Sequence, residues 1–193
     1  MRKTVTLLLM CICLCPAAFA QAKKMEREKR VKKEDIPMAV HNTLEKFIED
    51  ARKVRYYLET DVDHRSFEIK FLLRKRQYSV EFNDSGQLED VEMIIGFEEL
   101  QKELQKKITS HLGRYDSFKV KKMQKQFSSG SQSDEAVIEM ALQNVATETV
   151  RYEIIVETKT DVSWTTFEML FDAQGNFISE KEVVGRLADH ILY

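Results

Sequence analysis

The sequence predicts an α+β fold made of two tandem repeats, each with one helix packed on a four-stranded antiparallel sheet. Phe82 and Gly86 correspond to Phe171 and Gly175 within two similar short segments, at the same offset of 89 residues (171 − 82 and 175 − 86). A helical hydrophobic period is also followed by strand-like alternation twice along the chain. The alternative is one continuous mixed α+β domain in which the similarity of the segments is accidental.

The first repeat, residues 35–96, is predicted to open with a helix, because Asp35 can cap it and Pro37 fits its first turn. Its apolar stripe consists of Val40, Leu44, Phe47, Ile48 and Ala51. The hydrophobic period then drops to two, which predicts four strands, around residues 54–58, 67–73, 78–82 and 88–95. Between the last two, the composition of Asn83–Gly86 is typical of a tight hairpin turn.

The second repeat, residues 97–185, is predicted to follow the same order. Its helical stripe consists of Leu100, Leu104, Ile108 and Leu112, and its strands lie around residues 118–120, 152–156, 167–171 and 176–184. The offset between the copies grows along the chain, which indicates an insertion at 128–149 and a shorter one near 158–163. The larger insertion begins with a Ser- and Gly-rich stretch and continues as a short amphipathic helix.

Both ends of the chain are predicted to lie outside the repeats. Residues 1–20 have a basic start, a short apolar run and small residues before Gln21, which is typical of a cleaved signal peptide. The alternative is a retained membrane anchor. Residues 21–34 are expected to be a basic flexible tail, with membrane-surface contact as the alternative role, and residues 186–193 a C-terminal tail.

The composition excludes several classes of function. All 3 cysteines lie within the signal segment, so the mature chain is expected to hold no disulfide, thiolate metal site or cysteine nucleophile. The 30 basic side chains are outnumbered by 32 acidic ones, and loss of Arg2 and Lys3 increases this excess. Such a balance argues against nucleic-acid binding. We expect a periplasmic or secreted protein.

The pattern resembles the PepSY-like family, and within it the proteins similar to β-lactamase inhibitor protein. The resemblance depends on the helix starting at Ile36, the strand Tyr78–Phe82, the turn Asn83–Gly86 and their counterparts in the second repeat. It implies a secreted or periplasmic chain in which each repeat lays a helix against an antiparallel sheet. In the inhibitor, the joined sheets form a concave face that grips an enzyme. This chain differs in its insertion at 128–149, and no contact residues are transferred.

No motif indicates catalysis, so we expect no enzyme, no cofactor and no metal. The four histidines, His41, His64, His111 and His190, lie on different elements and lack metal-helix spacing. Each is interpreted as a surface or boundary residue. The segment Asp61–Asp63 lacks the glycine and the closing glutamate of a calcium loop. Clustering of His64 or His111 with carboxylates in a cleft would favour an enzyme instead.

A partner-binding face is the functional candidate. If the buried strand residues face the helices, their neighbours lie on the opposite face of the sheet. The candidate residues are Trp164, Thr166, Glu168, Leu170, Ile155, Tyr57, Lys70 and Leu72. Trp164 is the only tryptophan, a residue type enriched at interface anchors. The alternatives are a solvated face with scattered apolar residues, or a Trp164 covered by the inserted helix.

The sequence therefore predicts an exported, non-enzymatic module that binds a protein or peptide on an open sheet face, with enzyme inhibition as one outcome. The alternative is an envelope carrier of a small apolar ligand. A closed pocket lined by Met140, Leu142 and Trp164 would favour the carrier.

Overall fold

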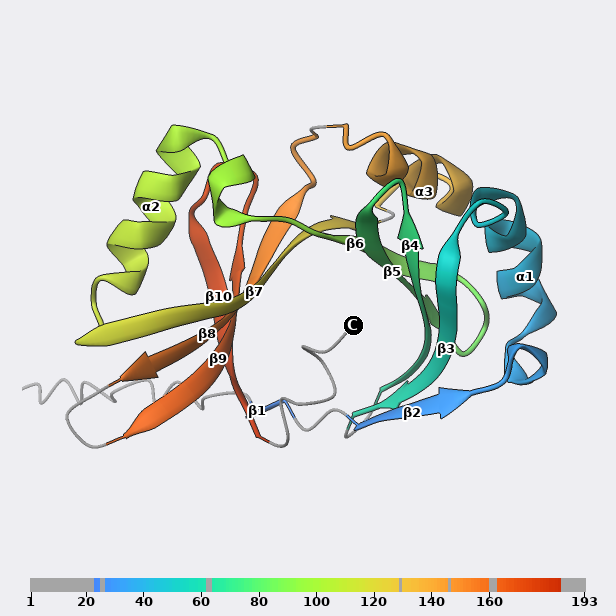
Figure 1. The fold of residues 1–193 in the computed structure, drawn as a ribbon, viewed down its shortest axis with the longest axis horizontal. Helices are drawn as coiled ribbons and strands as arrows, with labels where there is room; N and C mark the ends of the chain where they lie inside the picture. The colour runs from blue at the N-terminus through green and yellow to red at the C-terminus, as the bar shows by residue number, and fades with distance from the viewer. Residues whose placement is uncertain are drawn as a thin grey trace, which may run out of the picture.

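The computed structural model describes residues 23–24, 27–61, 64–128, 130–145, 147–159 and 163–184. Within them, ten strands form one sheet in the order β1-β10-β9-β8-β7-β6-β5-β4-β3-β2 (Figure 1). All neighbouring strands are antiparallel except the pair of β1 and β10. The predicted signal peptide at 1–20 and the predicted tail at 186–193 lie outside the described residues.

The elements have the following bounds. The strands are β1 Lys23–Lys24, β2 Arg27–Val31, β3 Arg52–Thr60, β4 Arg65–Leu73, β5 Arg76–Asn83, β6 Leu88–Ile94, β7 Ser117–Ser128, β8 Arg151–Lys159, β9 Trp164–Phe171 and β10 Phe177–Val183. The helices are α1 Met38–Leu44, α2 Lys102–Leu112 and α3 Asp134–Leu142, with short 3-10 turns at Lys33–Asp35, Glu45–Phe47 and Phe97–Glu99.

The prediction of an α+β fold with antiparallel strands is confirmed, but the two sheets that we expected are one. Strand β6 pairs with β7 over five residues, with Glu92 opposite Gln126. This pairing is made possible by the length of β7, which runs over 12 residues. The sequence indicated only its first residues, because after Val120 polar residues stand on both sides of each apolar position.

The predicted flexible tail is partly a strand. Arg27–Val31 forms β2 and pairs with β3, from Arg27 opposite Thr60 to Val31 opposite Tyr56. Two interactions add to the backbone pairing: Val31 packs against the hydrophobic core, and the carboxylate of Glu28 pairs with Lys70. The prediction of a mobile segment was therefore wrong for these residues, because their burial depends on neighbours distant in sequence.

All three helices pack on one face of the sheet, which curls so that they lie on its outer, convex side (Figure 1). Helix α1 contributes Val40 and Leu44 to a core cluster with the buried residues of β4, β5 and β6. Helix α2 contributes Leu104, Ile108 and Leu112 to a second cluster with β7, β8 and β9. The described helices include none long and apolar enough to cross a membrane.

The insertion at 128–149 carries the predicted helix, but this helix packs on the first half of the sheet. Ser133 caps α3 by accepting a hydrogen bond from the backbone N–H of Ala136. Val137, Ile138 and Ala141 of α3 then join the first core cluster, against β6 and α1. The second half of the chain thus completes the core of the first.

The two glycine turns have the same backbone structure. Gly86 and Gly175 both have a φ of +78°. Their N–H groups donate to the carbonyls of Asn83 and Asp172, at 2.8 and 2.9 Å. In each turn the side-chain Oδ1 of Asn83 or Asp172 also accepts hydrogen bonds from the backbone N–H groups two and four residues later. The predicted hairpin turns are therefore present.

Candidate functional site

The inner face of the curled sheet is the candidate site. In β4, Phe67, Ile69 and Phe71 are buried toward the helices, so alternation places Glu68 and Lys70 on the opposite face. No helix of the described residues packs on this opposite face (Figure 1). We call it the concave face. The concave face consists of every second residue along each strand, namely those whose side chains point to the same side of the sheet as Glu68.

All eight predicted binding residues are on strands with this orientation, but they form two groups. Tyr57, Lys70 and Leu72 lie on β3 and β4. The other five, Ile155, Trp164, Thr166, Glu168 and Leu170, lie on β8 and β9, with Ile155 opposite Glu168. Strands β5, β6 and β7 separate the groups. The structure thus places the predicted residues at the two sides of the concave face.

Their accessibility differs. Trp164 is 54% exposed, whereas Ile155 and Lys70 are 7% and 3% exposed. Helix α3 packs against β6, β7 and α1 on the other side of the sheet, so the inserted helix does not cover Trp164. Trp164 is accessible for contact, whereas Ile155 and Lys70 are held within the protein.

Lys70 is the centre of a buried ion-pair network. Its ammonium lies 2.9 Å from Glu28 Oε2 and 2.8 Å from Glu68 Oε2, and 5.0 Å from the ring centroid of Tyr57. Burial raises the pKa of Glu28, with Lys70 opposing. Burial also disfavours the charged form of Glu68, but a hydrogen bond with Glu59 and the ammonium of Lys70 hold its pKa below the usual value.

A row of carboxylates occupies the middle of the concave face. Glu81 lies opposite Asp90, and Glu92 lies opposite Ser79 on β5. Burial, reinforced by the charges of Glu92 and Glu81, raises the pKa of Asp90 well above its usual value. Burial is also the main reason why the pKa of Glu81 rises to about 7. The amides of two glutamines on β7 donate to these acids, Gln126 to Asp90 and Gln124 to Glu92.

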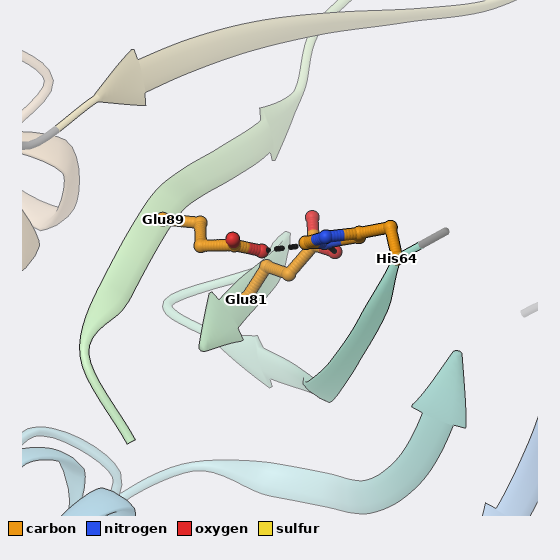
Figure 2. A group of neighbouring side chains, drawn as sticks. All are labelled: His64, Glu81 and Glu89. Atoms are coloured by element: carbon orange, nitrogen blue, oxygen red, sulfur yellow. Dashed lines mark hydrogen bonds and ion pairs between the residues drawn. The ribbon is translucent and has the colours of Figure 1, made fainter. Parts of the chain in front are cut away.

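At one end of this row, His64 joins two carboxylates (Figure 2). Its Nε2 lies 3.0 Å from Glu89 Oε2 and 3.9 Å from Glu81 Oε1. The Ser66 hydroxyl donates to Glu81 Oε1 at 2.5 Å. The His64 side chain is 51% exposed, and those of Glu81 and Glu89 are 25% and 29% exposed. The cluster is therefore reachable from solvent.

Strand pairing brings these three residues together. His64 is fixed by two backbone hydrogen bonds with Asp61, which close the β3–β4 connection. Glu68 lies opposite Glu81 and Ser66 opposite Asn83, so Ser66 is a diagonal neighbour of Glu81. His64 directly precedes β4, and its side chain reaches to within 3.9 Å of Glu81. A bulge between Glu81 and Phe82 then brings Glu89 of β6 beside them.

Sequence reasoning interpreted His64 as a surface or boundary residue, and its side chain is 51% exposed. The clustering with carboxylates that would favour an enzyme is present, but the sequence did not identify Glu81 and Glu89 as the neighbours. The β4–β5 register depends on a two-residue turn at Arg74 and Lys75, both of which have positive φ. That turn type usually contains Asn or Gly, so these residues did not indicate it. The alternation of His64, Ser66 and Glu68 indicated that these residues share one face of the sheet. It could not indicate their neighbours, because the register of the adjacent strand was not known.

Comparisons with known proteins show the fold but not the family. No family model and no curated protein matches the sequence. Solved structures do match: a DUF2874 family protein from Bacteroides ovatus has a TM-score of 0.52 at 15% identity, over 76% of this chain and 86% of that one. A BLIP-like protein from Bacteroides fragilis has a TM-score of 0.50 at 12% identity, over 78% and 88%. The chain has the fold of the BLIP-like proteins.

A proposed periplasmic protein from Bacteroides eggerthii is similar to the same extent, with a TM-score of 0.50 at 10% identity over 76% of this chain and 88% of that one. At such identities, the similarity shows a shared fold alone. The expectation of a fold like that of β-lactamase inhibitor protein is thereby confirmed.

Proposed function

We propose that this protein is an exported, non-enzymatic binding module that holds a protein or peptide on its concave face. The observation that carries the proposal is a curved sheet face, free of described helices, with carboxylates along its middle and the exposed Trp164 at its side. The fold shared with a BLIP-like protein and with a proposed periplasmic protein supports it. Enzyme inhibition is one form that this binding takes.

The chemistry of the face supports a partner that carries basic residues. The carboxylates of Glu81 and Asp90 have raised pKa values because they are buried beside other acids. A lysine or arginine side chain of a partner relieves this repulsion and supplies charge-assisted hydrogen bonds. Trp164, at the start of β9, offers an aromatic anchor nearer the other side of the face. We expect a partner segment with basic residues followed by an apolar one.

A gene duplication accounts for the architecture. The identical hydrogen bonds around Gly86 and Gly175, and the order of helix then strands in each half, support two PepSY-like repeats that merged into one sheet. The signal-like segment 1–20 supports the proposed exported location.

Selection of peptides from a random displayed library tests this function. We expect the immobilised protein to enrich peptides rich in Lys and Arg that also carry an aromatic or aliphatic residue. Their affinity should fall at high salt, because exposed charges are screened. Substitution Trp164→Ala, and separately the double substitution Glu81→Gln with Asp90→Asn, should weaken binding of the enriched peptides by about tenfold or more.

The matched control is Glu103→Gln, on the exposed surface of α2 at the convex side. It should bind the peptides as the wild-type chain does. Selection of acidic peptides, or equal loss of binding in the control and in the concave-face variants, would rule out the proposal.

The carrier of a small apolar ligand has less support. Met140 and Leu142 pack against the first core cluster, whereas Trp164 lies exposed on β9, so these three do not line one pocket. A cavity of about 270 Å³ instead lies at the β6–β7 junction, where Ile94, Ile95 and Phe97 line it together with two lysines and Gln77. The displayed-peptide experiment distinguishes the two, since a carrier would enrich no peptide.

A further inference from the structure

His64, Glu81 and Glu89 present three metal-ligating atoms toward one point (Figure 2). The atoms are one imidazole nitrogen and one oxygen from each of two carboxylates, and all lie within 4.8 Å of one another. Glu81 and Glu89 come from β5 and β6, and His64 directly precedes β4, where two backbone hydrogen bonds with Asp61 hold it. This arrangement involves different residues from the Lys70 network and goes beyond the proposed binding of a partner.

The distances suit a metal ion with little movement of the side chains. Ligands at roughly 2.0–2.2 Å from a tetrahedral zinc ion lie roughly 3.3–3.6 Å from each other. Here Nε2 of His64 is 3.0 Å from Glu89 and 3.9 Å from Glu81. Shifts of a few tenths of an ångström, which lengthen the His64–Glu89 distance and shorten the His64–Glu81 distance, bring both to about that range.

We propose that His64, Glu81 and Glu89 bind a divalent zinc ion. An imidazole together with two carboxylates is a donor set that zinc accepts, and three protein ligands leave a fourth position for water or for a group of a partner. The half-exposed ring of His64 gives the ion a path from solvent. The acids Asp90 and Glu92 nearby on β6 increase the attraction for a cation.

Contacts behind the ligands hold them in place. The Ser66 hydroxyl donates to Glu81 Oε1, and the backbone of His64 is tied to that of Asp61. Such supporting hydrogen bonds orient metal ligands and set their affinity. Ser66 is fully buried, so its position is fixed by the packing of β4.

A second group of three carboxylates shows the contrast. Glu28, Glu59 and Glu68 also bring oxygens within 4.8 Å of one another. The ammonium of Lys70 already lies between Glu28 and Glu68, at 2.9 and 2.8 Å. A cation of the protein itself thus already occupies that group. Among the described residues, Glu81 and Glu89 form ion pairs with His64 and with no lysine.

Isothermal titration of the chelator-treated, untagged protein with zinc chloride tests the proposal. We expect one zinc ion per chain, and X-ray absorption of the zinc-loaded protein should show one imidazole with oxygen neighbours. His64→Gln and Glu89→Gln should each weaken zinc binding by about tenfold or more, and Ser66→Ala by about tenfold. Zinc should also raise the thermal midpoint of the wild-type protein but not that of His64→Gln.

The matched control is His41→Gln, a half-buried histidine whose ring nitrogen contacts the Lys33 carbonyl. It should bind zinc like the wild type. Unchanged zinc affinity in His64→Gln, or equal loss in His41→Gln, would overturn the proposal. Circular dichroism of each variant shows whether it is folded; if His64→Gln does not fold, Glu89→Gln and the absorption spectrum of the wild-type protein decide. The result is independent of any partner, so loss of peptide binding leaves it standing.

Discussion

Lys70 is a buried charge whose environment explains its role. Its ammonium is between Glu28 and Glu68, and it is 3% exposed. A buried ion pair contributes little net stability while intact, but removal of one partner leaves the others desolvated and uncompensated. Lys70, which the sequence indicated as a partner contact, therefore has a structural task on the concave face.

Lys70→Met should reduce the free energy of unfolding by about 3–5 kcal/mol, because Glu28 and Glu68 lose their buried cation. Urea unfolding measures this loss of free energy of unfolding. Lys46→Met is the control, since the pair of Lys46 with Glu135 is more than half exposed. That control should cost less than about 1 kcal/mol. Equal losses in the two variants would contradict this account.

His111 gives the folded protein a dependence on pH. Its ring stacks on Phe177 at 4.1 Å and meets Phe171 edge-on at 5.4 Å. Burial lowers the pKa of His111 below 6.5, Arg114 lowers it further, and Glu180 opposes both. The unfolded chain therefore binds the proton more readily than the folded one. The stability contributed by neutral His111 is present above pH 6.5 and is lost as the pH falls through the lowered pKa.

We expect His111→Phe to lose less stability than the wild type between pH 7 and pH 5, because phenylalanine keeps the stacking but binds no proton. Urea unfolding at the two pH values measures the difference. His41→Gln, which changes a half-buried ring that contacts the Lys33 carbonyl, should lose as much stability on acidification as the wild type. The hypothesis fails if His111→Phe shows the same loss on acidification as the wild type.

At the scale of elements, the two hairpin turns are alike in backbone but differ in what packs against them. A Cβ added at Gly86 would lie 2.8 Å from Ala39 Cβ on α1. A Cβ added at Gly175 would lie 3.5 Å from its nearest neighbours on α2, which is ordinary contact. The first turn is thus pressed against its helix, and the second is not.

Gly86→Ala should therefore destabilise the protein more than Gly175→Ala. Both substitutions put a side chain at a φ of +78°, at a cost of roughly 1–2 kcal/mol. Only Gly86→Ala should add a further loss of about 1–3 kcal/mol, because α1 has to move. Thermal unfolding of the two variants measures this difference in stability. Equal midpoints would contradict the prediction, because they would show that α1 moves at no cost in free energy.

At the scale of the whole molecule, the continuous sheet couples the two halves. Strands β6 and β7 pair directly, and α3 of the later segment fills the core of the earlier one with Ile138. The first half has no complete core without the second, whereas the buried residues of the second cluster all come from the second half. Folding should therefore be a single cooperative process.

Ile138→Ala in the first cluster and Ile108→Ala in the second should each shift one common unfolding transition. Both side chains are fully buried, so each loss should be about 2–5 kcal/mol. Calorimetry and circular dichroism measure the transition. Two separate transitions, each moved by only one of the substitutions, would show two independent domains instead.

Local patterns made much of the fold predictable. The alternation in residues 67–73 and 78–82 indicated β4 and β5, and the stripe at Leu104, Ile108 and Leu112 indicated α2. Which residues share the concave face also followed from alternation. The strand β2 and the full length of β7 did not follow, because polar residues form strands only where a neighbouring edge offers hydrogen bonds.

The sequence by itself determined the α+β class, the paired glycine turns and the two faces of the sheet, because each depends on contacts between residues close in the chain. The tertiary structure alone decided that the halves share one sheet, that α3 packs on the first half and that His64 meets Glu81 and Glu89. These features depend on strand register and on long-range pairing, which arise from packing over distances that no local pattern encodes.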